Sequence, residues 1–254
     1  MLQLENIVKN FGGLLVLDSL SLQVGEGLIF GLIGPNGAGK TTLFNIISGL
    51  SRPSAGRVIF NGTDITNSTP PSIADRGMGR TFQNIRIFKE LSLLENVLAG
   101  MHRLYTYSPI AMLLNLPIQR REEKAMREKA MEILELFRLA DKAQRQAESL
   151  SYGEQRKLEL ARALATSPKL LLVDEPAAGM NPAETEELMG EIVQINNRGY
   201  TICLIEHDMK FVMGVCRQIA VLNFGKLIAL GTPEQVKCNP QVVEAYLGKD
   251  ICKL

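Results

Sequence analysis

Apolar residues along this chain recur at two different spacings, which predict strands and helices in a definite order. The stretch up to about residue 65 reads as short strands, and Asn61-Gly62 after the apolar run 58–60 predicts a tight hairpin. A continuous apolar run over 28–33 predicts a buried strand, and residues 42–50 after it repeat apolar positions at helical spacing. The pattern therefore predicts strand, loop and helix in succession.

The second half of the chain alternates between the two spacings. Residues from about 89 to 165 lack strand signals and are predicted to be helical. Strand patterns return at 169–173 and 201–205, and a polar helix is predicted over 183–196 between them. A second hairpin is predicted around 223–226. Strands that alternate with helices indicate an α/β fold with a parallel sheet.

Composition and charge narrow the function classes. The chain has 254 residues, and its 28 Lys and Arg nearly cancel its 27 Asp and Glu. No global field would therefore draw it onto nucleic acid or an anionic bilayer. The longest uncharged stretch, 104–119, contains two prolines and is shorter than the ~20 apolar residues of a spanning helix. We therefore expect that the chain does not cross a membrane. Its four cysteines lack CxxC spacing, and we expect the protein to stay in a reducing cytosol.

Residues 34–41 read GPNGAGKT, a complete G-x-x-x-x-G-K-[ST] phosphate loop between the predicted strand and helix. The bare pattern should arise by chance roughly once in a hundred chains of this length, so a merely structural glycine turn is a minor alternative. Lys40 is expected to reach the β and γ phosphates of ATP, and the Thr41 hydroxyl to bind Mg²⁺. The predicted nucleotide contacts in this loop are Gly34, Pro35, Asn36, Gly37, Ala38, Gly39, Lys40, Thr41 and Thr42.

Residues 170–175 read LLLVDE, an apolar strand that ends in two carboxylates. Two acids at the end of a buried strand are costly unless a positive charge lies nearby, and Mg²⁺ held by the phosphate loop would supply it. Asp174 is therefore predicted to bind Mg²⁺, and Glu175 to polarise a water toward the γ phosphate. An acidic strand end by itself is often a solvated turn or a helix cap.

Ser151 and Glu154 open a predicted helix with the S-x-x-E pattern of a capping box. Alone, this pattern favours an ordinary capped helix. The segment LSYGEQRKLELARAL, which contains this pattern, resembles the signature motif of ABC-type ATPases. It precedes the acidic strand at the spacing found in that family, which favours a functional role over a merely structural cap. The resemblance implies that Ser151, Gly153 and Gln155 contact nucleotide.

The resemblance also implies roles for three other residues. Gln83, in GRTFQN, resembles the Q-loop glutamine, which in the family touches Mg²⁺ and the attacking water. His207, after the strand pattern ICLIE, resembles the switch histidine that contacts the γ phosphate. Phe11 lies where the family stacks an aromatic ring on adenine, with a core phenylalanine as the alternative. Gln83, Glu175 and His207 are thus the expected catalytic residues.

The resemblance covers nearly the whole chain and narrows to one branch. RGMGRTFQNIRIFKELSLLENV, DEPAAGMNP, EHDMKFVMG and GTPEQVKCNPQVVEAYLG resemble the ATP-binding subunit of Liv-type high-affinity branched-chain amino acid importers. The signature departs from the commonest form at Tyr152 and Glu154, and Asn181 replaces the usual D-loop Asp, as in the Liv-type branch. The resemblance implies one ABC ATPase domain over 1–254: a P-loop core with a mixed or parallel sheet, an N-terminal antiparallel β part and a helical lobe at about 89–165.

Partners follow from the same resemblance. In the family two ATPase subunits pack head to tail, so we expect a homodimer or a paralogous heterodimer that binds ATP and ADP. Transmembrane permease subunits and, indirectly, a periplasmic or extracellular binding protein are the other expected partners. We expect a peripheral location on the cytoplasmic face of the cell membrane, and a cytosolic protein when isolated.

Several alternatives stay open for the transported solute. A urea or amide importer and a lipopolysaccharide-extraction transporter have similar motifs. A nucleic-acid-acting ABC ATPase is disfavoured because such proteins usually carry two modules or basic arms, whereas this chain has one module and a net charge of +1. No nucleic-acid partner is expected.

The stretch 83–95 follows the Q-loop and contains Ile85, Ile87 and Phe88, which we predict to be exposed. In the family, the cleft beside the Q-loop receives a short cytoplasmic helix of the permease. These residues are therefore predicted to dock the permease, the alternative being that Ile87 and Phe88 pack under the helical lobe.

Overall fold

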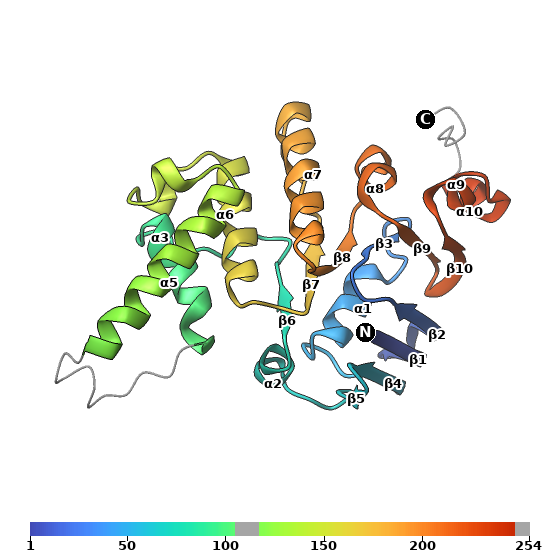
Figure 1. The fold of residues 1–254 in the computed structure, drawn as a ribbon. Helices are drawn as coiled ribbons and strands as arrows, with labels where there is room; N and C mark the ends of the chain where they lie inside the picture. Colours follow the sequence, from blue (N-terminus) through green and yellow to red (C-terminus); the bar gives the residue numbers. More distant parts are fainter. Residues whose placement is uncertain (105–116, 247–254) are drawn as a thin grey trace.

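Two β-sheets form the framework of the protein in a computed structural model that describes residues 1–104 and 117–246 (Figure 1). In chain order the strands are β1 (Leu2–Phe11), β2 (Leu14–Val24), β3 (Ile29–Ile33), β4 (Ala55–Phe60), β5 (Thr63–Asp64), β6 (Met78–Arg80), β7 (Leu170–Asp174), β8 (Thr201–Ile205), β9 (Gln218–Asn223) and β10 (Lys226–Gly231).

Helices cover the sheets, and none of those within the described residues is long and apolar enough to span a bilayer. The α-helices are α1 (Lys40–Ile47), α2 (Pro70–Asp75), α3 (Leu93–Met101), α5 (Pro117–Leu136), α6 (Tyr152–Ala165), α7 (Pro182–Asn197), α8 (Met209–Val215), α9 (Pro233–Lys237) and α10 (Pro240–Ala245). Short 3-10 turns occur at η1 (His102–Leu104), η2 (Ala140–Lys142) and η3 (Ala147–Ser149).

The larger sheet has the strand order β10-β9-β3-β8-β7-β6, and the smaller has the order β2-β1-β4-β5. In the larger sheet β3 runs parallel to β8 and β9, β7 runs parallel to β6 and β8, and β10 is antiparallel. The strand pairs of the smaller sheet are antiparallel. The predicted α/β class with an antiparallel N-terminal part is confirmed. Because parallel strands end at one edge, the segments after β3, β6, β7 and β8 meet there.

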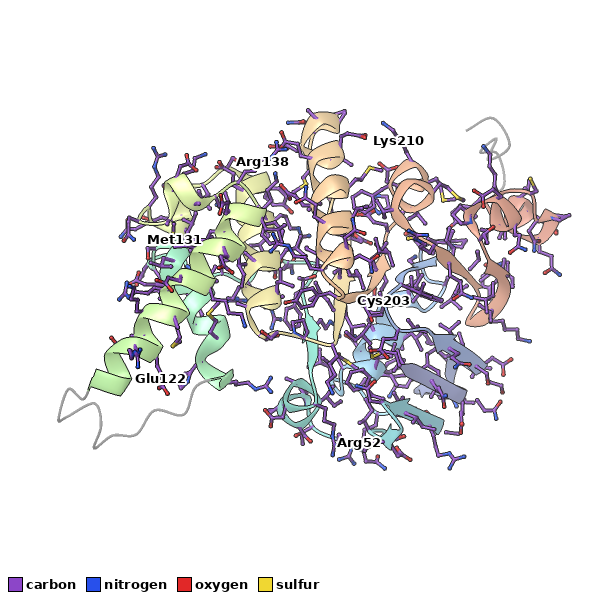
Figure 2. The ribbon with its side chains drawn as sticks, in the orientation of Figure 1. Arg52, Glu122, Met131, Arg138, Cys203 and Lys210 are labelled. Carbon is purple, nitrogen blue, oxygen red and sulfur yellow. The ribbon has the colours of Figure 1, made fainter. Side chains whose placement is uncertain are left out.

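Two hydrophobic clusters join the layers. On one face of the larger sheet, α1 packs between the two sheets, where Phe44 contributes to the same buried cluster as Cys203 of β8. Figure 2 shows Cys203 in the interior. On the other face, Leu171 and Ile202 share a cluster with Phe137 and with buried residues of α3, α5, α6 and α7. The helices at 93–165 are therefore tied to the central sheet by one continuous apolar core.

Both predicted hairpins are present. Asn61 and Gly62 adopt φ of +48° and +75° between β4 and β5. Two left-handed residues in succession are what a type I′ turn requires, and its twist matches that of the paired strands. The second hairpin pairs Asn223 with Lys226 across β9 and β10. Local turn chemistry thus decided both hairpins.

The helix predicted over 42–50 is shorter at its C-terminal end than the pattern indicated. α1 ends at Ile47, and Gly49 turns the chain with φ of +74° while its N–H donates to the Ile46 carbonyl at 3.1 Å. Leu50 consequently lies outside the helix, and 53% of it is exposed. The prediction was wrong for Leu50 because a left-handed glycine ends a helix whatever apolar residue follows.

Candidate active site

A glycine-rich loop connects the buried strand β3 to the N-terminus of α1. Gly39 is the N-cap residue with φ of +102°, and a Cβ there would meet Leu17 Cδ2 at 2.7 Å, so no other residue fits without displacement. No side chain caps α1, and its first turn holds no acidic residue. The first amides of a helix lack intrahelical partners and carry its positive end. This loop is therefore built to receive an anion such as a phosphate.

Lys40 opens α1 and is almost wholly buried, with 8% exposed. Its Nζ donates to the carbonyl oxygens of Gly34 at 2.7 Å and Pro35 at 3.1 Å, which fold the side chain over the loop. Burial lowers the pKa of Lys40, and the carboxylates of Glu175 and Asp174 oppose that shift. A cation thus lies at the phosphate loop within the field of both acids.

Asp174 ends β7 with 2% of its surface exposed. Its Oδ2 lies 3.6 Å from Arg80 Nη2, and its backbone N–H donates to Thr81 Oγ1 at 3.2 Å. Burial raises the pKa of Asp174, while the Arg80 guanidinium acts in the opposite direction. The strand end therefore presents a carboxylate held out of water, a group that gains most from a nearby cation.

Glu175 follows immediately and meets two other predicted residues. Gln83 Nε2 donates to Glu175 Oε2 at 3.2 Å, and His207 Nδ1 lies 4.0 Å from Glu175 Oε1. These three residues follow the ends of β6, β7 and β8, so the parallel sheet explains why they meet. Glu175 also has φ of +46°, an uncommon backbone conformation for a residue other than glycine. Such strain concentrates at functional sites. The structure brings the three together, and their catalytic roles stay a prediction.

The oxygen donors at this edge fit Mg²⁺. Magnesium prefers a few protein oxygens together with water and phosphate oxygens rather than a complete protein cage. Across the described part of the chain, no group of three or more His, Cys, Asp and Glu could hold a metal by itself. The Asp174 carboxylate, the Thr41 hydroxyl and the Gln83 amide oxygen are the donors that the sequence predicted, and they suit a metal whose remaining ligands come from nucleotide.

The signature segment begins α6, away from the phosphate loop. Ser151 is the N-cap, and the predicted capping box is confirmed, because its Oγ accepts from Glu154 N while Glu154 Oε2 accepts from Ser151 N. Gly153 is buried against Glu184, and Gln155 Nε2 donates to the Leu150 carbonyl at 3.0 Å. Figure 1 shows α6 beside α3 and α5, across β6 and β7 from α1. One chain therefore does not bring its signature to its own phosphate loop.

Asn181, which replaces the usual aspartate of the D-loop, caps a helix of its own chain. Its Oδ1 accepts from the backbone N–H groups of Ala183 and Glu184 at 3.0 Å each, and it is the N-cap residue of α7. Asparagine is among the preferred residues at this position. The side chain is thus engaged within its own chain.

Phe11 ends β1, and 51% of it is exposed. The ring lies beneath the Lys9 ammonium, whose Nζ is 4.7 Å from the ring centroid. The alternative of a core phenylalanine is therefore excluded. A partly exposed ring offers a face to a planar ligand, and contact with adenine stays a prediction.

A cavity of about 630 Å³ lies beside the Q-loop. Leu50, Phe82, Phe88 and Arg162 are among the residues that line it, and the Arg162 guanidinium lies 5.2 Å from the centre of the Phe88 ring. Phe88 is 51% exposed, as predicted, but Ile87 is partly buried against the main hydrophobic cluster. The prediction of an exposed Ile87 was wrong, because Ile87 packs against the cluster while the adjacent Phe88 lines the cavity. Ile85, also predicted to be exposed, is only partly exposed.

Sequence reasoning missed several buried charged residues around the site. Glu206 is 1% exposed, and its carboxylate accepts from Ala177 N at 2.9 Å and His207 N at 3.0 Å, so it joins the segment after β7 to the segment after β8. Burial raises the pKa of Glu206. An acid directly after an apolar strand was the available signal. Arg156 and Glu159 are two other buried charged residues that were missed. Arg80, whose side chain is 9% exposed, was missed as well.

Residues 17–178 match the family model described as ABC transporter. The chain belongs to the ABC transporter ATPase family. As a member, it is an ATP-hydrolysing transport ATPase. Residues 226–251 also match the model described as branched-chain amino acid ATP-binding cassette transporter.

Curated relatives of this ABC ATPase match along almost its whole length. It is 43% identical over 250 residues to the high-affinity branched-chain amino acid transport ATP-binding protein BraF of Pseudomonas aeruginosa, with 98% of each chain covered. It is 42% identical, with the same coverage, to the corresponding protein LivG of Escherichia coli. The lipopolysaccharide export system ATP-binding protein LptB of Haemophilus influenzae is 36% identical over 249 residues, again with 98% of each chain covered.

Solved structures agree with the family assignment. The ADP conformation of MJ1267, an ATP-binding cassette of an ABC transporter, superposes with a TM-score of 0.84 at 37% identity, covering 98% of this chain and 99% of that one. The dimeric structure of the bacterial cassette MJ0796 gives a TM-score of 0.78 at 25% identity, covering 92% and 99%.

Proposed function

We propose that this ABC transporter ATPase binds Mg-ATP at residues 34–42 and hydrolyses it, as one of two paired ATPase subunits, to drive import of branched-chain amino acids through a membrane permease. The observation that carries the proposal is the contact of Gln83 and His207 with Glu175 at the sheet edge where β3 delivers the phosphate loop. The match of the C-terminal segment to a branched-chain amino acid cassette model supports the solute.

Each site residue has a distinct part in this proposal. Lys40 and the amides of the loop bind phosphate oxygens, and the Asp174 carboxylate, Thr41 hydroxyl and Gln83 amide oxygen hold Mg²⁺. The metal supplies charge neutralisation at the transferred phosphate when it is bound. Glu175 accepts the proton of the attacking water at its carboxylate, and Gln83 orients that carboxylate. His207 donates a hydrogen bond to the γ phosphate.

The second half of each site comes from a partner ATPase in this proposal. Ser151 is the exposed N-cap of α6, where helix amides can meet an anion. Figure 1 shows α6 across β6 and β7 from α1, the helix that follows the phosphate loop. A head-to-tail pair places that terminus, with Gly153 and Gln155, against the partner's nucleotide. Phe11 stacks on adenine. The dimeric cassette MJ0796 supports such a pairing.

One domain and one docking surface complete the proposal. Residues 1–254 form a single ATPase domain with a helical lobe at about 89–165, since the helices there share an apolar cluster with the central sheet. The cavity lined by Leu50, Phe82 and Phe88 accepts a cytoplasmic segment of the permease. The chain is then peripheral on the cytoplasmic side of the membrane. A binding protein on the other side delivers the solute to the permease.

The solute follows from relatives rather than from any residue of the ATP site. Identity is higher to the branched-chain amino acid transport proteins, at 42–43%, than to the lipopolysaccharide export protein, at 36%. The C-terminal match supports the same choice.

Deleting the chain should abolish high-affinity uptake of leucine, isoleucine and valine together, because the three share one ATPase. Radiolabelled leucine uptake at low external concentration measures this, with uptake of an unrelated sugar as the control. The wild-type chain on a plasmid should restore uptake, and Glu175→Gln should not. Normal leucine uptake in the deletion strain, with lost lipopolysaccharide export or urea uptake, would overturn the solute and leave the ATPase mechanism standing.

A further inference from the structure

Arg156 is a charged residue buried in the middle of the molecule, with 2% of its surface exposed. It lies in the second turn of α6 and points at the Q-loop. Its Nη1 donates to the Phe82 carbonyl at 2.7 Å, and its Nη2 donates to the Gln83 carbonyl at 2.6 Å and the Glu175 carbonyl at 3.4 Å. One guanidinium therefore contacts the backbone of both Gln83 and Glu175, whose side chains meet at the edge of the larger sheet.

Glu159, one turn further along α6, pairs with this arginine and grips the same loop. Its Oε2 lies 3.1 Å from Arg156 Nη1, and its Oε1 accepts from Phe82 N at 3.4 Å and from Arg86 N at 3.1 Å. Burial raises the pKa of Glu159, while the Arg86 amide and the Arg156 charge oppose this. Residues 82–86 are thus held at both carbonyl and amide groups by one face of α6.

The chemistry of arginine explains why this residue type occupies the position. The guanidinium is a rigid planar fork whose two terminal nitrogens point apart, so a single side chain can bridge the loop after β6 and the end of β7. Lysine carries its charge on one nitrogen and cannot span both. A carboxylate displaced by about 1 Å from its reacting geometry can lose roughly 10²-fold in rate.

We propose that Arg156 is a positioning residue for ATP hydrolysis: with Glu159 it fixes the backbone of Gln83 relative to Glu175 and so sets the contact between their side chains. The proposal rests on the catalytic roles proposed above for those two residues. It assigns α6 a function within its own chain, separate from the part that its N-terminus plays toward a partner.

The decisive variant is Arg156→Lys in the full-length chain, because it keeps a cation beside Glu159 and removes the fork. We expect kcat for ATP to fall by roughly 10- to 100-fold with KM and the nucleotide dissociation constant changed less than about threefold, since the phosphate loop is untouched. The thermal midpoint should stay close to that of the wild type. Leu164→Ala, a buried position on the same helix, is the control for lost stability alone.

A second variant keeps the test decisive if lysine is poorly accommodated. Arg156→Met with Glu159→Gln removes both buried charges together and leaves an amide oxygen for the Phe82 and Arg86 amides. We expect this pair to recover the melting temperature lost by Arg156→Met alone, while kcat stays low. A structural ion pair predicts instead that activity returns with stability.

The outcomes separate this inference from the proposed function. Wild-type protein without Mg-ATP hydrolysis, or an active Glu175→Gln variant, contradicts the proposed site, and the inference about Arg156 fails with it. With wild type active, a kcat for Arg156→Lys within about twofold of wild type overturns the inference. So does a loss of activity that merely follows the melting temperature and is matched by Leu164→Ala.

Discussion

Glu175→Gln tests the chemical step with the smallest change of shape. The amide keeps the volume of the carboxylate. The backbone N–H of Glu175 donates to the Ile205 carbonyl at 2.9 Å, and the substitution leaves both of these backbone groups in place. The new amide oxygen can also accept from Gln83 Nε2, which lies 3.2 Å from Glu175 Oε2. The fold and the local geometry should therefore survive, with a change in unfolding free energy within about 1 kcal/mol.

The magnitude follows from the loss of basicity. Removing a positioned general base typically costs 10²- to 10⁴-fold in rate, which corresponds to about 3–5 kcal/mol of activation free energy. Nucleotide binding should be unchanged or tighter, because Glu175 places a negative charge near Lys40 and the triphosphate binds there. Mg-ATP should then hold two subunits together, since hydrolysis no longer separates them.

Three measurements check this prediction: steady-state ATPase rates, titration with a fluorescent ATP analogue, and size-exclusion chromatography with Mg-ATP. Glu26→Gln makes the same chemical change on an exposed turn and should behave as wild type. Turnover within about twofold of wild type, with nucleotide binding intact, would refute the assignment of Glu175 as the base.

Three further variants test the remaining parts of the site. Lys40→Ala removes charge-assisted hydrogen bonds to the phosphates worth about 1.5–3 kcal/mol, so a fluorescent ATP titration should show affinity weakened by roughly 10- to 100-fold, and an ATPase assay should show lost turnover. Unchanged affinity and an unchanged ATPase rate would exclude the loop as the nucleotide site. In the wild type, the ATPase rate should rise faster than linearly with protein concentration; Ser151→Arg adds a positive charge at the N-terminus of α6 and should abolish this rise, whereas Ser151→Thr keeps the cap and should preserve it. A linear rate that survives Ser151→Arg would mean that one chain forms a complete ATP site by itself. Phe88→Asp should end co-purification with the permease while ATP binding and the melting temperature stay near those of wild type, because Phe88 is half exposed and the new carboxylate can pair with Arg162. A strongly lowered melting temperature would mean instead that Phe88 stabilises the fold. Val193→Asp, on the half-exposed surface of α7, is the control away from the cavity.

The sequence by itself determined the elements and motifs that depend on neighbouring residues. The phosphate loop at 34–41, the capping box that starts α6 and the turn at Asn61-Gly62 each need only a few consecutive residues of the right type. The alternation of strands and helices over 169–205 predicted a parallel sheet, which β7 and β8 form. These features follow from backbone sterics and local hydrogen bonding, which act within a few residues.

The tertiary structure alone decided which distant segments meet. Gln83 and Glu175 are in contact because β6 and β7 are neighbours in the sheet, a strand order that periodicity does not encode. The division of Ile87 from Phe88 between core and cavity likewise depends on the helices packed beside them.

Arg156 and Glu159 show the limit most clearly. On α6 they read as ordinary charged positions of a surface helix, yet both are almost wholly buried. A charge can be buried only where partners compensate its lost hydration, and here those partners are the backbone groups of Phe82, Gln83 and Arg86, more than 70 residues away along the chain. Since local sequence carries no record of such partners, only the folded chain could reveal that these two charges lie at the centre of the site.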